Sequence, residues 1–238
     1  ATPAFTPGAH FTFSTFSGGI TNSGTGLINA AAGNGVWIGG KATNSSSVVI
    51  STFGGGIVNN GMITAAIGKG IFLGGTATAS STVTVSTFSG GITNNGTISA
   101  KTGIMVNYVS VFQGAIVNSG SITGTGGTAL DLSAAPNGMT VDITAGAISG
   151  IILGNGTSHG DTVNFTLGAG NTFAYSSTIS GMQTVAVNSG TLFDGGAITA
   201  GTVMVNNGGT LAPGAPGVAG GTLHLFGNLA LVSGATYM

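Results

Sequence analysis

The chain has 238 residues, and its 42% hydrophobic content is enough to build a core and argues against disorder. Only 3% of the residues are charged, where a soluble domain carries roughly 25%, and the net charge is -1. Three Lys without any Arg cannot form the basic clusters that nucleic-acid binding needs, and the absence of Cys removes disulfides and thiolate metal sites. We therefore expect no nucleic-acid partner.

No stretch of about 18 apolar residues runs without Gly, Asn, Ser or Thr, so we expect no membrane-spanning helix within the chain. The first residues, ATPAFTP, contain neither an initiator Met nor a basic segment. A secretory signal is therefore expected to have been removed already or not to be included. The lack of Cys also suits a protein that crosses an oxidising compartment while unfolded.

Short strands separated by glycine are expected along the whole chain. The 47 glycines disfavour helices, because each interior Gly costs about 1 kcal/mol relative to Ala. Between them lie alternating runs rich in β-branched residues: SVVIST, STVTVSTF, GIFLGG, GIMVNYV, MTVDITA, TVNFTL, QTVAVNSG, GTVMVNNGG, TLHLFG and LALVSG. Such a pattern fits an antiparallel sandwich or barrel, or a coiled parallel solenoid.

A repeated phrase rich in Gly and Asn decides between these folds. It reads STFSGGITNSGT (14–25), STFGGGIVNNGMI (51–63), STFSGGITNNGTI (86–98) and FQGAIVNSGSI (112–122). Its Phe column and its Asn column share the spacings 37, 35 and 24, which is typical of stacked coils. The Asn column is expected to form a structural ladder of side-chain amides at a tight turn, with a row of ligand-binding amides as the alternative; its members are Asn22, Asn59, Asn94 and Asn118.

The second half of each repeat also aligns, as VWIGG, IFLGG, IMV and LDL. Strand alternation predicts one inward column, formed by Val36, Ile38, Ile71, Leu73, Ile104, Val106, Leu130 and Leu132. The spacing of 24 is expected to be a single coil. The longer spacings then contain insertions at residues 41–50 and 76–85.

The outward positions of the same segments are Trp37, Phe72, Met105 and Asp131. An apolar stripe made by the first three is a candidate ligand-binding surface. Trp37 and Phe72, however, belong to the coils that carry insertions. We favour the interpretation that the insertions fold back over these aromatic residues and bury them.

The C-terminal part carries a more specific pattern. Residues 202–237 contain a valine-alternating strand, the turn NNGGTLAPG and the strand pair GTLHLFGNLALVSGATY. This pattern resembles the passenger-associated transport repeat of type V autotransporters, with Phe226 where the family usually has a small or β-branched residue. The Gly- and Asn-rich phrases between residues 14 and 122 likewise resemble autotransporter passenger repeats.

The resemblance implies a right-handed parallel β-helix displayed outside a Gram-negative cell. It also implies export through an outer-membrane barrel that is expected downstream and is absent from this chain. We expect one continuous solenoid, with a repeat region at 1–182 and a C-terminal module at 183–238 that resembles the transport repeat.

Parallel β-helices also include enzymes that act on polysaccharides, and these need clustered carboxylates or basic residues. The four acids here are scattered, one per segment, and there is no Glu or Arg: Asp131, Asp142, Asp161 and Asp194. Of the three histidines, His10, His159 and His224, only His159 lies near an acid, in SHGD (158–161). A solvated loop explains that segment better than a catalytic triad does.

Two binding signatures are weak. GNGTSHGDTVNF (154–165) is similar to a calcium-binding nonapeptide, but it is a single imperfect copy with one carboxylate. The Thr-x-Thr steps at 76–78 and 82–84 do not recur at coil spacing, so they do not form an ice-binding array. We therefore expect no catalytic residue, no metal site and no cofactor.

The sequence thus predicts an all-β, right-handed parallel β-helix that serves as a non-enzymatic passenger or stalk of an autotransporter-like bacterial surface protein. Its expected partner is a host or matrix surface. A self-assembling extracellular fibre or surface layer, whose partners are identical subunits, is the alternative, because the near-zero net charge and scarce Lys favour association. A polysaccharide-acting enzyme on the same fold is the least favoured hypothesis.

Overall fold

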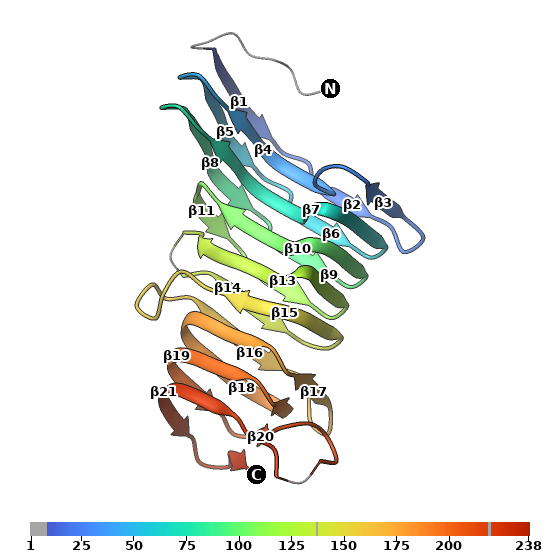
Figure 1. The fold of residues 1–238 in the computed structure, drawn as a ribbon, viewed down its shortest axis with the longest axis vertical. Coiled ribbons are helices and arrows are strands. Elements are labelled where there is room, and N and C mark those ends of the chain that lie inside the picture. Colours follow the sequence, from blue (N-terminus) through green and yellow to red (C-terminus); the bar gives the residue numbers. More distant parts are fainter. Residues whose placement is uncertain (1–8, 137, 219) are drawn as a thin grey trace.

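The computed structural model describes residues 9–136, 138–218 and 220–238, so the ATPAFTP start lies outside the described part. Strands coil repeatedly around one axis and stack into an elongated body, with the first strand at one end and the last at the other (Figure 1). Every strand pairing among the described residues is parallel. The all-β parallel β-helix predicted from the repeats is therefore confirmed.

The strands follow one another without an intervening helix in the described residues. The first half contains β1 (His10–Phe16), β2 (Ile20–Asn22), β3 (Leu27–Ala30), β4 (Val36–Ala42), β5 (Ser47–Phe53), β6 (Ile57–Asn59), β7 (Met62–Ala77), β8 (Thr82–Ser89), β9 (Ile92–Asn94), β10 (Thr97–Asn107) and β11 (Val109–Gln113). The second half contains β12 (Ile116–Asn118), β13 (Ser121–Ala134), β14 (Thr140–Ile143), β15 (Ala147–Leu153), β16 (Thr162–Thr166), β17 (Thr172–Tyr175), β18 (Thr178–Asp194), β19 (Ala197–Val205), β20 (Gly209–Pro213), β21 (His224–Leu231) and β22 (Thr236–Tyr237).

The core consists of columns in which each coil places an apolar side chain on the one before it. The inward column predicted from the sequence is confirmed: its members lie in register on β4, β7, β10 and β13 and are at most 6% exposed. A second column runs through nearly the whole molecule, formed by Ile20, Ile57, Ile92, Ile116, Val141, Val163, Val185 and Val203; Leu229 is next in register at the C-terminal end and is 42% exposed. Burial of these columns supplies the main stabilising free energy.

The phenylalanines that open the repeated phrases form a third column. Phe16 and Phe53 stack with ring centroids 4.8 Å apart, Phe53 and Phe88 with centroids 5.4 Å apart, and Phe88 and Phe112 with centroids 5.2 Å apart. Phe88 lies in the middle of this column and is fully buried. The strand spacing of about 4.8 Å brings equivalent rings into contact, so a repeated Phe is a packing requirement of the stack.

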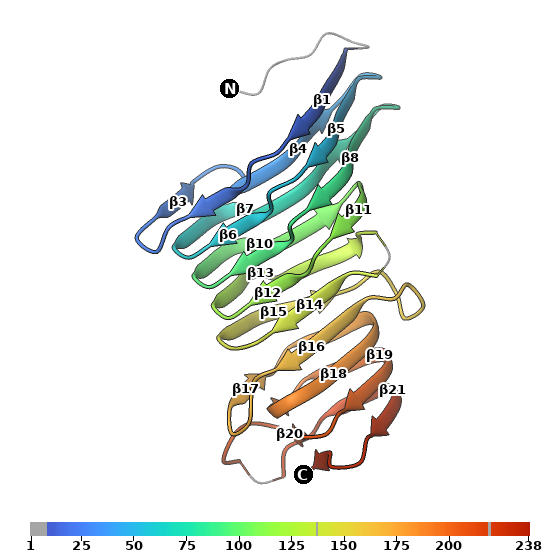
Figure 2. The ribbon, with the colours of Figure 1, turned by 180° about the vertical axis from the view of Figure 1, so that it is seen from behind.

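The insertions widen the first coils sideways instead of folding over their outer face. The strand pairs β4–β7 and β5–β8 continue past the common core and enclose a small core of their own, made by Ala42, Val48 and Val83. Figure 2 shows β1, β5 and β8 side by side along this extension. We call residues 39–50 and 74–85 the lateral arm. The expectation that the insertions fold back and bury both outward aromatic residues fails for Trp37, which is 38% exposed, because the arm buries its own inner face; Phe72 is buried, at 1% exposed, with Trp37 and Lys69 packed against its ring.

Asn107 closes the root of the lateral arm where the next coil lacks an insertion. Its side-chain oxygen accepts from the Gly75 backbone N–H at 2.9 Å, and its side-chain nitrogen donates to the Gly75 carbonyl at 3.2 Å. The amide thus replaces the backbone of the missing strand continuation. A buried N–H and C=O that would otherwise lack partners are thereby paired.

Strand pairing continues through the C-terminal coils. β18 crosses the sequence-based boundary between residues 182 and 183, and it pairs with β15 and β16 on one side and with β19 on the other. The division into two parts stays a prediction. Within the residues described here, no helical segment has the length and hydropathy needed to cross a bilayer.

The phenylalanine column makes a first prediction. Replacing Phe88 by Ala removes a fully buried ring between two stacked neighbours, so the free energy of unfolding should fall by about 3 to 5 kcal/mol. Equilibrium urea denaturation followed by circular dichroism measures this loss. Phe226→Ala, at a position that is 60% exposed, should cost less than about 0.5 kcal/mol; equal losses in the two variants would contradict the packing described.

Candidate functional site

The four asparagines of the repeated phrases form a buried ladder along the stack. Asn22 Nδ2 donates to Asn59 Oδ1 at 2.8 Å, Asn59 Nδ2 to Asn94 Oδ1 at 2.7 Å, and Asn94 Nδ2 to Asn118 Oδ1 at 2.8 Å. Asn59, Asn94 and Asn118 are fully buried. The ladder ends where Ile143 takes the next position in register with Asn118. The three fully buried amides bond to one another and to backbone carbonyls, so they present no group to a ligand; at the open end of the ladder, Asn22 donates through Nδ2 while its Oδ1 accepts no bond from a described residue.

An exposed ladder runs beside the buried one. Asn95 Nδ2 donates to Asn60 Oδ1 at 2.8 Å, and Ser119 Oγ donates to Asn95 Oδ1 at 2.8 Å. Each of these residues directly follows a member of the buried ladder. Water can replace their bonds, so the exposed ladder should contribute much less to stability.

The predicted outward stripe is a real column in register, but its members differ in exposure. Trp37 pairs with Phe72, Phe72 with Met105, and Met105 with Asp131. Trp37 is 38% exposed, Met105 and Asp131 are half-buried, and Phe72 is only 1% exposed. The column continues past Asp131 through Leu153, Ser180, Thr199 and Phe226.

Phe72 is covered by its neighbours on the outer face. The Trp37 ring stacks on it with centroids 5.6 Å apart, and Lys69 Nζ lies 4.9 Å from its centroid. Phe72 therefore supports the surface and cannot itself be a contact residue. Of the proposed ligand-binding stripe, only Trp37 and the half-buried Met105 remain accessible.

Trp37 is held in one orientation. Its indole N–H donates to the carbonyl oxygen of Gly74 at 2.9 Å. Gly39 and Gly74 have positive φ values of 138° and 106°, and a Cβ on Gly39 would lie 1.7 Å from that same carbonyl oxygen. The absence of side chains at these two positions leaves the space across which the indole reaches Gly74.

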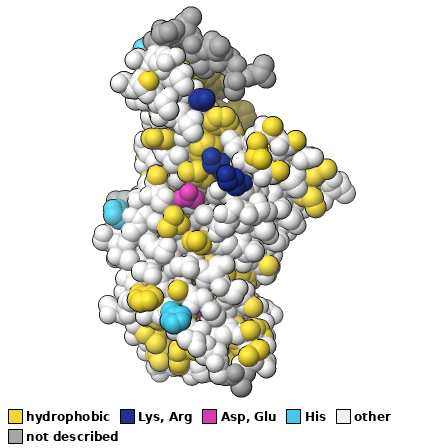
Figure 3. All heavy atoms as spheres, in the orientation of Figure 1, with side chains coloured by type: hydrophobic (Ala, Val, Ile, Leu, Met, Phe, Trp, Pro, Cys, Tyr) yellow, Lys and Arg dark blue, Asp and Glu magenta, His cyan; other side chains and the backbone are white. Residues whose placement is uncertain are grey.

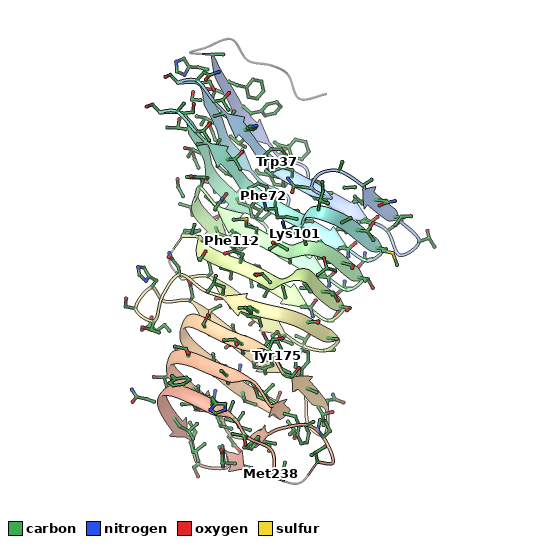
Figure 4. The ribbon with its side chains drawn as sticks, in the orientation of Figure 1. Trp37, Phe72, Lys101, Phe112, Tyr175 and Met238 are labelled. Atoms are coloured by element: carbon green, nitrogen blue, oxygen red, sulfur yellow. The ribbon has the colours of Figure 1, made fainter. Side chains whose placement is uncertain are left out.

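Lysines surround this aromatic pair. Lys41 follows Trp37 on β4 with the same outward parity, and Lys69 lies over Phe72. Lys101 directly precedes Thr102, which pairs with Lys69, and Figure 4 shows it on the same face as Trp37 and Phe72. Because the chain has only three Lys and no Arg, its entire side-chain positive charge apart from histidine lies on this part of the surface. In Figure 3 the dark-blue atoms gather on the upper half of one face, with yellow atoms between them. We call the outer surface formed by Trp37, Lys41, Lys69 and Lys101 the tryptophan–lysine face.

Asp161, the acid of the SHGD segment, connects three parts of the stack. Its Oδ1 accepts from the Met139 N–H and its Oδ2 from the Asn155 N–H, each at 2.9 Å. The side chain is fully buried, whereas His159 is exposed. This carboxylate therefore has a structural role that its position in a polar loop did not reveal.

Asp194 is the most unusual acid in the chain. It is fully buried, its Oδ1 accepts from the Gly196 N–H at 2.7 Å, and its Oδ2 has no hydrogen-bond partner. Burial raises the pKa of Asp194 from 3.8 to about 6, against the opposing hydrogen bond from Gly196. Burial, and then the charge of Asp194, also raise the pKa of the neighbouring Tyr175 hydroxyl, which bonds to the Gly150 and Thr178 carbonyls.

The remaining titratable groups are dispersed. Asp131 accepts from Ser133, Asp142 accepts from Asn164, and His10 bonds to Ser47. In the described part of the chain, no group of three or more His, Asp or Glu side chains is placed to hold a metal ion. Residues 76–78 and 82–84, the Thr-x-Thr steps, lie in the lateral arm.

Sequence reasoning missed the roles of Asn107, Asp161 and the lysines. Asn107 aligns with Gly74 of the preceding coil, because Val106 pairs with Leu73. A polar residue at the point where an insertion is lost is a usable signal for a capping side chain. The lysine grouping could have been found by assigning strand parity to each charge in the chain.

The buried ladder makes a second prediction. Asn94→Ala leaves Asn59 Nδ2 and Asn118 Oδ1 without their partners, and it should lower the free energy of unfolding by about 2 to 4 kcal/mol. Asn95→Ala, one residue along in the exposed ladder, should cost less than about 1 kcal/mol. Urea denaturation of the two variants measures both, and a larger loss in the Asn95 variant would refute the assignment of the ladders.

Asp194 makes a third prediction, on pH. The folded chain binds the Asp194 proton more tightly than the unfolded chain, in which the pKa is 3.8. The contribution of this group is therefore complete below pH 4 and is lost as pH rises through 6. The shift of roughly two units corresponds to about 3 kcal/mol.

Urea denaturation between pH 4 and pH 7 tests this dependence. Four Asp and no Glu make the profile simple, so Asp194→Asn should remove most of the fall in stability. The matched control is Asp142→Asn, at a half-buried position bonded to Asn164, and it should retain the fall. A wild-type profile that rises over this range would contradict the burial of Asp194.

Comparisons with protein-family models, with curated proteins and with solved structures give no match for this chain.

Proposed function

We propose that this chain is a non-enzymatic β-helical passenger or stalk segment of a bacterial surface protein. It is exported across the outer membrane and serves in adhesion or surface display. The observation that carries the proposal is the use of its polar side chains within the stack. The Asn ladder, Asn107 and Asp161 all bond to neighbouring coils. A rod whose buried polar side chains bond to neighbouring coils suits a scaffold that holds a surface away from its point of attachment.

The likeness of residues 202–237 to the passenger-associated transport repeat supports the same proposal from the sequence. The low charge and the absence of Cys are compatible with export in an unfolded state. Among possible enzymatic carboxylates, Asp161 is fully occupied by backbone N–H groups and Asp194 is buried. Asp131 and Asp142 are bonded to Ser133 and Asn164 and belong to different strands.

A labelling experiment tests the location. Antibodies raised against the purified chain should label intact cells of the organism that encodes it, with no increase after permeabilisation. Labelling only after permeabilisation would contradict display on the surface. An antibody against a cytoplasmic protein is the control for cell integrity.

The same purified chain tests the absence of catalysis. Incubation with polygalacturonate should release no new reducing or unsaturated ends; release that is lost in Asp131→Asn would overturn the non-enzymatic assignment. Negative-stain images should show short single rods at all concentrations. Filaments of regular width would instead favour the self-assembling fibre.

A further inference from the structure

We propose that the tryptophan–lysine face binds an acidic polysaccharide of low charge density, with one carboxylate per sugar. This inference deepens the proposed function, since such polymers are met outside cells. The face combines an oriented aromatic ring with the only lysines of the chain. These are the two elements that recognise a sugar ring and its carboxylate.

The aromatic element is pre-organised. Trp37 stacks on Phe72 at an interplanar angle of 17°, and its N–H is already bonded to Gly74. The ring therefore needs no further polar partner and offers apolar surface with little loss of conformational freedom on binding. The C–H groups of a sugar ring pack on such a surface while the hydroxyl groups stay in water.

The charged element is available for a ligand. Lys41 and Lys101 are exposed, and neither forms an ion pair with a described residue. Lys69 lies over Phe72, which keeps its ammonium group beside the aromatic pair. Asp131, the acid in the same column, has its Oδ1 occupied by Ser133.

The distribution of the other charges makes the face distinct. The three lysines of the chain give the surface around Trp37 a local excess of positive charge, offset in part by Asp131 in the same outward column, whereas Asp161 and Asp194 are fully buried. Three separated lysines without Arg match spaced carboxylates better than closely spaced sulfates or phosphates, which favour bidentate Arg. Lys69 and Lys101 lie on adjacent strands, and the strand spacing of about 4.8 Å is comparable to one sugar ring.

Binding of the purified chain to immobilised polygalacturonate tests the inference at low and moderate salt. The chain should bind, and binding should weaken as salt rises, because the lysine contacts are exposed. Dextran, which has no charge, should not bind. Heparin, which is densely sulfated, should bind more weakly than polygalacturonate.

Variants separate the two elements of the face. Trp37→Ala should weaken binding about tenfold, equivalent to 1.4 kcal/mol, without changing its salt dependence. Lys101→Gln and Lys41→Gln, at exposed positions that do not threaten folding, should each weaken binding and flatten the salt dependence. Phe226→Ala is the matched control, because Phe226 occupies the same outward column at the far end, away from the lysines.

The inference is overturned if polygalacturonate does not bind, or if these Trp37 and Lys variants bind as the wild type does. Tight binding to heparin that is unchanged in the Trp37→Ala variant would also overturn the inference, because such binding would be non-specific ion exchange. The result is independent of cell labelling. A chain confined to the cell interior would refute the proposed function. Failure to bind the polymer would refute only the ligand assigned to the tryptophan–lysine face.

Discussion

Parallel pairing of each coil with the next, in register, is the constraint on which the rest of the structure depends. Once the backbone is paired in this way, each paired side chain lies beside its equivalent in the next coil, about 4.8 Å away. Apolar residues then form continuous columns, and phenylalanines stack. A buried amide can donate to the equivalent amide of the next coil, so it needs no water molecule as a partner. A single buried Asn would be costly, whereas a column of them satisfies itself.

The same constraint explains how the coils accommodate length changes. Because register is fixed at the ladder and at the inward column, extra residues can only extend a coil sideways, as they do in the lateral arm. Gly75 pairs with Gly40 on one side, but the loss of the insertion in the following coil leaves it without a strand partner on the β10 side, where Asn107 fills that role. Variation is thereby confined to positions where it does not disturb the stack, and the tryptophan–lysine face includes one residue of the lateral arm, Lys41.

The repeats made much of the fold predictable. Equal spacings of Phe and Asn identified stacked coils, and strand parity placed Val36, Ile71 and Ile104 inside. Parity could say that Trp37 and Phe72 point outward, but it could not say how their neighbours cover them. Phe72 is buried by side chains from Trp37 and Lys69, which depends on three-dimensional packing. The burial of Asp161 and Asp194 was equally hidden, because the sequence assigned the Asp161 segment to a solvated loop and carried no signal for the burial of Asp194.

The central claim, that repetition exists to match each coil to its neighbour, is tested most directly by a double-mutant cycle on the ladder. Unfolding free energies of Asn59→Ala, Asn94→Ala and the double variant give the coupling between two directly bonded amides. The structure predicts a coupling of about 1 to 2 kcal/mol, while Asn59→Ala combined with the distant Asn164→Ala should be additive within about 0.5 kcal/mol. Additivity of the Asn59 and Asn94 variants would contradict the claim.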